Sequence, residues 1–177
     1  MKFVISCLML VFALTPAMAQ DLIKKRGPAP DFPTAGKWIG TTKPLTLERL
    51  RGKVVLVHFW RHGDEACESN FKVFESWLAK HAPAGLTVIG IHPPDFENNP
   101  EPAEVEKTAV KYAKVFPSLI EETDFTVKGW NVNGYPTLFL IDRRGQFRAA
   151  FEGQLIYKRF RGDLVVEKFI DELLSEK

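Results

Sequence analysis

Residues 54–78 read VVLVHFWRHGDEACESNFKVFESWL, and they predict a buried strand followed directly by a helix. Val54–Phe59 is a short apolar run interrupted only by His58, which is typical of a central strand buried on both faces. Asp64 is a good helix N-cap, with acidic residues in the first turn after it. The helix then has a single apolar face, formed by Cys67, Phe71, Phe74 and Leu78. We therefore expect Cys67 to point toward the core.

The rest of the chain continues the alternation of strands and helices. A second buried strand is predicted at Leu86–Ile91, and a helix that begins at Pro102 has the apolar face Val105, Ala109, Tyr112 and Phe116. The further predicted elements are a strand at Ser118–Ile120, a short helix at Asp124–Trp130, strands at Thr137–Ile141 and Gln146–Phe151, and a helix at Asp163–Ser175. This order predicts an α/β fold with a mixed sheet, parallel central strands, a C-terminal β-hairpin and helices on both faces.

The length and the charge of the sequence exclude some classes of protein. The 177 residues are 45% hydrophobic, enough for the core of one domain. With 24 Lys and Arg against 22 Asp and Glu there is no basic stripe, which argues against a nucleic-acid partner. The short basic patch Lys158, Arg159 and Arg161 is interpreted as a solvated surface. Residues 20–43, rich in Pro and Gly, are interpreted as an N-terminal extended arm that leads into a domain at residues 44–177.

Residues 1–19 have the pattern of a secretory signal peptide. Lys2 is followed by an apolar run, and Ala17-Met18-Ala19 is a cleavage signature. The run is too short for a stable membrane span, so we expect no membrane insertion after cleavage and a periplasmic or secreted protein. Cleavage would remove Cys7 and leave Cys67 as the single thiol in an oxidising compartment.

Several motifs, in order, resemble the exported thioredoxin-like proteins of the TlpA and DipZ type. They are Ala29–Phe32, Leu45–Val57, Phe59-Trp60, Val88–Phe96 and Tyr135–Thr137 followed by Leu140–Gly145. The resemblance covers residues 29–175 and implies a thioredoxin fold, a thioredoxin-like domain at residues 44–177 and a thiol–disulfide oxidoreductase site. It also implies that Pro136 is the cis-proline of this family. A binding groove would then be formed by Trp60, Tyr135 and Pro136.

The sequence departs from the family at the catalytic motif. In the family, Phe-Trp leads to Cys-x-x-Cys, and the two cysteine positions fall on residues 64 and 67. Here the tetrapeptide is Asp64-Glu65-Ala66-Cys67, so an aspartate stands where the attacking thiolate is implied. A carboxylate cannot attack a disulfide, so the dithiol exchange cycle has no first step by the family route.

Three interpretations of Cys67 stay open. It is a buried structural thiol, a slow monothiol, or a metal ligand. His58 either accepts a proton from Cys67 as a Cys–His pair or is a core histidine satisfied by hydrogen bonds. The candidate ligands for zinc or copper are Cys67, Asp64, His62 and His92, although no ligand spacing supports a metal site. His81 is expected on the surface, and Glu121-Glu122 is expected to be solvated loop charge.

These alternatives give three hypotheses for function. The first is a redox enzyme that acts through Cys67 alone. The second is a non-catalytic module that holds a protein or peptide in the groove beside Pro136. The third is a protein that handles copper or zinc through Cys67 and nearby histidines. No cofactor is predicted in any of them.

Overall fold

The computed structural model describes residues 22–24, 27–33, 35–95, 98 and 100–176. The predicted signal peptide at residues 1–19, with Cys7, and the first residues of the arm lie outside this part of the chain. Among the described residues, no helix is both long enough and apolar enough to cross a membrane.

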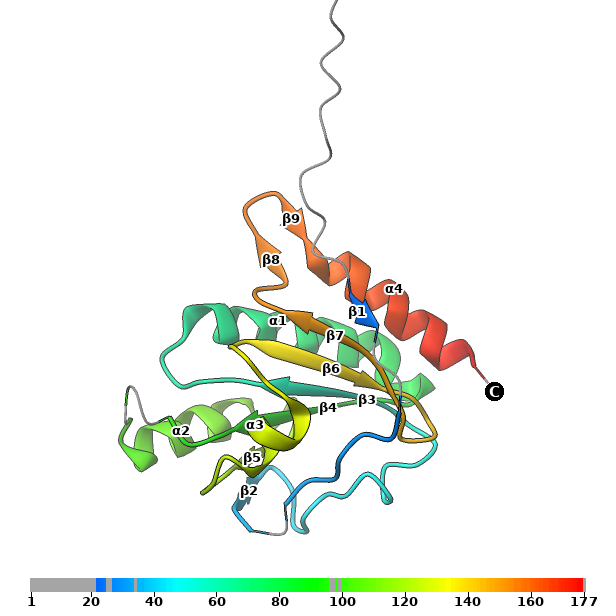
Figure 1. The fold of residues 1–177 in the computed structure, drawn as a ribbon. Helices are drawn as coiled ribbons and strands as arrows, with labels where there is room; N and C mark the ends of the chain where they lie inside the picture. Colours follow the sequence, from blue (N-terminus) through cyan, green and yellow to red (C-terminus); the bar gives the residue numbers. More distant parts are fainter. Residues whose placement is uncertain (1–21, 25–26, 34, 96–97, 99, 177) are drawn as a thin grey trace, which may run out of the picture.

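A seven-stranded mixed sheet forms the centre of the fold, with the strand order β1-β7-β6-β3-β4-β5-β2 (Figure 1). Strands β3, β4 and β5 are parallel, β6 runs antiparallel to β3, and β7 pairs antiparallel with β6 to form a hairpin. The bounds of the strands are β1 Ile23–Lys24, β2 Lys37–Ile39, β3 Val54–Phe59, β4 Leu86–His92, β5 Ser118–Ile120, β6 Thr137–Ile141 and β7 Phe147–Glu152. The predicted mixed sheet, with its parallel centre and its C-terminal hairpin, is confirmed.

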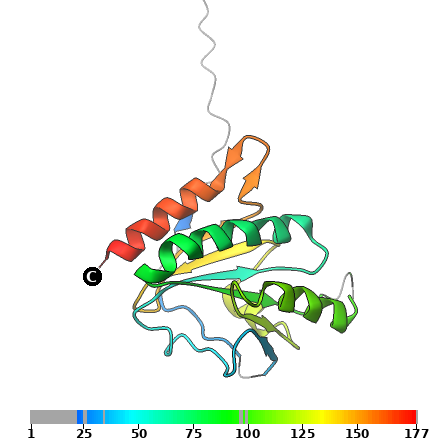
Figure 2. The ribbon, with the colours of Figure 1, turned by 180° about the vertical axis from the view of Figure 1, so that it is seen from behind.

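Helices cover both faces of this sheet, as predicted. Helices α1 (Glu65–His81), α2 (Pro102–Tyr112) and α4 (Gly162–Ser175) pack on one face, which Figure 2 shows from the front. The short helix α3 (Phe125–Trp130) covers the other face together with the segment 29–50. A 3-10 turn, Ala82–Ala84, connects α1 to β4.

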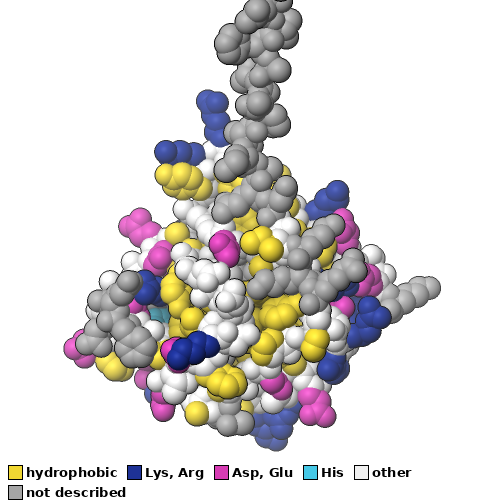
Figure 3. Space-filling model, viewed as in Figure 1, with side chains coloured by type: hydrophobic (Ala, Val, Ile, Leu, Met, Phe, Trp, Pro, Cys, Tyr) yellow, Lys and Arg dark blue, Asp and Glu magenta, His cyan; other side chains and the backbone are white. Residues whose placement is uncertain are grey.

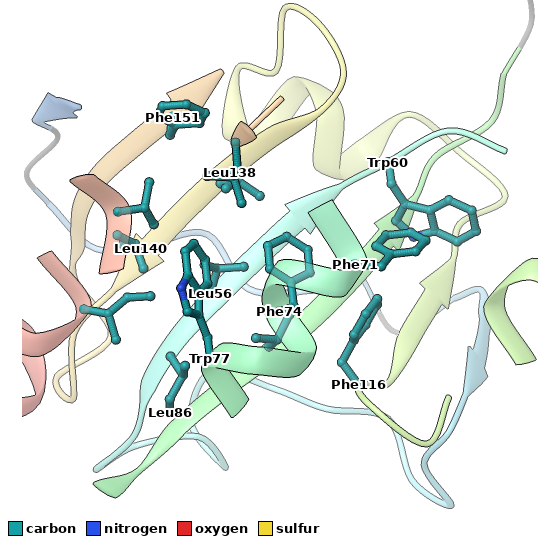
Figure 4. Packing of buried hydrophobic residues seen from close by; sticks show 14 of the residues in the cluster. Leu56, Trp60, Phe71, Phe74, Trp77, Leu86, Phe116, Leu138, Leu140 and Phe151 are labelled. Atoms are coloured by element: carbon teal, nitrogen blue, oxygen red, sulfur yellow. The ribbon is translucent and has the colours of Figure 1, made fainter. Parts of the chain in front are cut away.

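Strand β3 separates two hydrophobic clusters. All six of its residues are buried, and their side chains alternate between the two faces of the sheet. Val54 and Leu56 face α1, α2 and α4, while Val55, Val57 and Phe59 face α3 and the segment before β3. On the first face the aromatic rings of α1 interdigitate with the sheet (Figure 4); the buried residues there include Trp60, Phe71, Phe74, Trp77 and Phe116.

The arm contributes both edges of the sheet. Strand β1 pairs with β7, and β2 pairs with β5, both antiparallel. A second, two-stranded sheet is formed by β8 (Ile156–Tyr157) and β9 (Phe160–Arg161), just before α4. Strands β1, β2, β8 and β9 were not predicted from the sequence.

Two expectations about charged residues are wrong. His81 is not on the surface: it is buried, with its Nε2 3.1 Å from Glu167 Oε1. Glu121 is not a solvated loop residue: it is buried and accepts a hydrogen bond of 3.0 Å from the Thr126 amide and a second one from the Thr126 hydroxyl. Glu122 is exposed, as expected. In both wrong cases a neighbouring helix, α4 or α3, covers the residue, and local sequence gives no sign of that contact.

Candidate functional site

The candidate site lies in the turn between β3 and α1. Gly63 has φ +75, a left-handed conformation that glycine adopts without strain. The next residue, Asp64, caps α1: its Oδ1 accepts a hydrogen bond of 3.0 Å from the Cys67 amide. The carboxylate thus satisfies one of the free amides of the helix and interacts favourably with the helix dipole. The predicted N-cap is confirmed.

The thiol of Cys67 faces the core. Cys67 is 0% exposed and belongs to the cluster that contains Phe71 and Phe74. Burial raises the pKa of the thiol to about 12, and the negative charge of Asp64 acts in the same direction. At neutral pH the sulfur is therefore protonated, whereas thiol–disulfide exchange requires a thiolate. This geometry supports the buried structural thiol among the three interpretations of Cys67.

His58 fits neither of the roles expected for it. Its ring lies against the rings of Phe71 and Phe74, with centroid separations of 5.4 and 4.9 Å. Among the described residues neither ring nitrogen has a hydrogen-bond partner, so there is no Cys–His pair and no hydrogen-bonded core histidine. Burial lowers the pKa of His58 to about 3, and the ring is neutral at physiological pH.

The loop before β6 meets the turn before α1 through an arginine. The Tyr135–Pro136 peptide bond is cis, as the resemblance implied. The Arg61 guanidinium lies 4.8 Å from the centre of the Tyr135 ring, and its Nη2 is 3.1 Å from Oδ1 of the buried Asp95. Sequence reasoning missed both Arg61 and Asp95. A signal was present, since Arg61 directly follows Trp60, only three residues before the motif position Asp64.

Two of the candidate metal ligands do come together. The His62 amide donates to His92 Nε2 at 3.1 Å, and His62 Nδ1 is 3.0 Å from Thr108 Oγ1. Burial lowers the pKa of His92 to about 4, so its Nε2 is free to accept that bond. Among the described residues, however, no three His, Cys, Asp or Glu side chains are grouped as a metal ion would require. The lone pair of His92 Nε2 is already engaged within the chain.

The expected groove residues differ in accessibility. Trp60 is buried at the end of β3, with its ring 4.7 Å from that of His92. Pro136 is buried as well, and Tyr135 is half-buried. An open depression of about 550 Å³ lies at the turn before α1; its lining includes Arg61, His62, Gly63, Asp64, Glu101 and Glu104 and none of the three expected groove residues. The accessible part of the site is therefore this depression together with Tyr135.

The fold and the cis-proline opposite the start of α1 define a protein of the thioredoxin-like class. Residues 26–150 match the AhpC/TSA family, and the chain belongs to this family. DipZ of Mycobacterium tuberculosis is 30% identical over 152 residues, which are 85% of this chain and 21% of DipZ. The thiol-disulfide oxidoreductase YkuV of Bacillus subtilis is 23% identical over 155 residues, which are 87% of this chain and 99% of YkuV.

Solved structures agree with this assignment. A protein described as a thiol:disulfide interchange protein DsbE of Chlorobium tepidum superposes with a TM-score of 0.66 at 27% identity, covering 86% of this chain and 99% of its own. The resemblance to the DipZ type of thiol–disulfide oxidoreductase is thus confirmed. The chain spans about a fifth of the length of the DipZ relatives, so it corresponds to one part of them.

The unpartnered His58 should make the fold sensitive to acid. The unfolded chain binds a proton at His58 near pH 6.5 and the folded chain only near pH 3, so stability falls as the pH drops through this window. Between pH 7 and pH 4, the free energy of unfolding should fall in both proteins. In a His58→Leu variant it should fall by about 3 kcal/mol less than in the original protein. Urea unfolding at several pH values measures this difference. Parallel stability curves for the two proteins would show that His58 is not buried in its neutral form.

The thiol of Cys67 should be protected from alkylation. We expect negligible labelling by iodoacetamide at pH 7 in the folded protein, and rapid labelling after unfolding. The reaction is followed by mass spectrometry, with a Cys67→Ser variant as the blank. Labelling of the folded protein at the rate of the unfolded one would contradict the buried position.

Proposed function

We propose that this chain is an exported thioredoxin-like protein that has lost dithiol exchange and binds an extended segment of a partner protein beside Pro136. The observation that supports the proposal most directly is the state of the two motif positions. Asp64 stands at the first and is engaged as a helix cap, and Cys67 stands at the second with 0% of its surface exposed. The signal-peptide pattern of residues 1–19 supports export to the periplasm or beyond.

The charge arrangement around Tyr135 supports a binding role. Arg61 is held on one side by Asp95 and on the other by the Tyr135 ring, which joins the turn before α1, the loop after β4 and the loop before β6. A site whose loops are tied together in this way is ordered before a partner arrives and loses less conformational entropy on binding. Exchange chemistry would require a thiolate at the same place, and the nearest sulfur is protonated and buried.

The other two hypotheses receive less support. A monothiol enzyme needs Cys67 to reach its substrate, which burial opposes. A metal-handling protein needs a group of three or more ligands, and the described residues contain no such group.

Restoring the missing cysteine tests the loss of dithiol exchange. An Asp64→Cys variant should form an internal disulfide with Cys67 and gain insulin reductase activity, because the side chain at position 64 lies beside the Cys67 amide. The original protein should not exceed a Cys67→Ser variant in the same assay. A Glu65→Cys variant is the matched control, since it adds a thiol one residue away from the motif position. Activity of the original protein well above Cys67→Ser would refute the proposal.

Binding of an unfolded chain tests the groove. Reduced and carboxymethylated lactalbumin, an extended polypeptide without free thiols, should bind the original protein in a fluorescence anisotropy titration. A Tyr135→Ala variant should bind about tenfold more weakly, because the half-buried ring holds Arg61, which lines the depression. Tyr157→Ala changes an exposed tyrosine elsewhere and should bind as the original does. Equal affinities for all three proteins, each confirmed as folded by its unfolding transition, would place binding elsewhere.

A further inference from the structure

The hairpin β8–β9 projects from the body of the fold between β7 and α4 (Figure 1). It is anchored through β9, because the ring of Phe160, the residue that follows the turn, stacks on Phe151 with a centroid separation of 6.2 Å. Its turn lies at Lys158 and Arg159, and Lys158 has φ 51, a conformation that tightens the turn. The hairpin is therefore a projection held against β7 by Phe160.

Apolar side chains gather around this tip. Of the seven large hydrophobic residues that are exposed in the described part of the chain, four fall within residues 156–165. Ile156 is 42% exposed, Tyr157 is 55% exposed and Leu164, in the first turn of α4, is 53% exposed. Such a concentration costs solubility unless another surface covers it.

Two cations accompany these apolar residues. Lys158 and Arg159 are exposed, and within the described residues neither forms an ion pair with a carboxylate. The Lys158 ammonium lies 5.1 Å from the centre of the Tyr157 ring, whereas Arg161 is neutralised by Asp163 at 2.7 Å. Figure 3 shows Lys and Arg side chains beside a hydrophobic one at the top of the molecule, over the hairpin.

We propose that this tip, defined by Ile156, Tyr157, Lys158, Arg159 and Leu164, binds the surface of an anionic phospholipid membrane. A tyrosine beside aliphatic side chains fits the boundary between headgroups and acyl chains. Lys158 and Arg159 would then meet the lipid phosphates, whose negative charge is complementary to theirs. A stable protein–protein interface buries about 800 Å² on each partner. Shallow insertion into a membrane surface needs only a few side chains, so it suits a tip of five residues better.

The position of the tip in the fold supports this orientation. Strand β1 runs antiparallel to β7 with Ile23 opposite Ala150 and Lys24 opposite Ala149, so β1 begins toward the end of β7 that leads into the hairpin. Leu22, where the described chain enters β1, and the hairpin therefore lie at the same end of the sheet. This proposal does not depend on the groove beside Pro136.

Vesicle flotation tests the proposal with the chain from Gln20 onward, which retains every residue that the structure describes. Vesicles of phosphatidylcholine with about a third phosphatidylglycerol should bind the protein, and vesicles of phosphatidylcholine alone should not. Added salt should weaken the binding, because the cations supply much of it. A Lys158→Glu, Arg159→Glu variant should lower the partition coefficient at least about tenfold. A Tyr157→Ser variant should lower it severalfold while keeping the salt dependence.

The matched control carries the same change of charge away from the hairpin. A Lys43→Glu, Lys53→Glu variant alters two exposed lysines in the segment before β3 and should bind vesicles as the original does. Equal loss in the control, or equal binding to both kinds of vesicle, would overturn the proposal. Absence of vesicle binding together with a concentration-dependent dimer that Tyr157→Ser disrupts would also overturn it, and would assign the tip to a second copy of the chain.

Discussion

The burial of β3 on both faces is the constraint on which the other elements depend. Its backbone pairs with β4 on one side and β6 on the other, and its side chains supply two separate cores. A strand in this position cannot shift its register by one residue without exchanging the two cores. The end of β3 is therefore fixed, and with it the turn Trp60–Gly63 and the start of α1. The candidate site lies where it does because the strand before it cannot move.

Asp64 sets the electrostatics at the start of α1. The start of a helix stabilises negative charge, which is why a thiolate is favoured there when the residue is a cysteine. In this chain a carboxylate stands at the start of the helix, and it accepts a hydrogen bond from the Cys67 amide. A cap of this kind contributes about 1 kcal/mol to stability. The same charge opposes ionisation of Cys67, so the feature that stabilises the helix also suppresses the chemistry of the remaining sulfur.

The sequence predicts this fold well where the signals are local and periodic. The bounds of β3, β5 and β6, the cap at Asp64 and the inward direction of Cys67 all follow from short patterns. The errors concern contacts between distant segments. His81 is buried by Glu167 of α4, and Arg61 meets Asp95 from another loop. His58 was expected to have a hydrogen bond because buried polar groups usually do, yet the rings around it are phenylalanines.

The electrostatics of the site explain why membership of an oxidoreductase family does not by itself assign an activity here. The positive charge of Arg61 is compensated by the buried Asp95 and covered by the Tyr135 ring, and although Arg61 lowers the pKa of Cys67, burial raises it by more. The two buried histidines are neutral and one has its acceptor nitrogen occupied. Burial of Cys67 thus outweighs the groups that favour its thiolate. The proposed binding role therefore depends on the shape of the site around Pro136 and on no activated nucleophile.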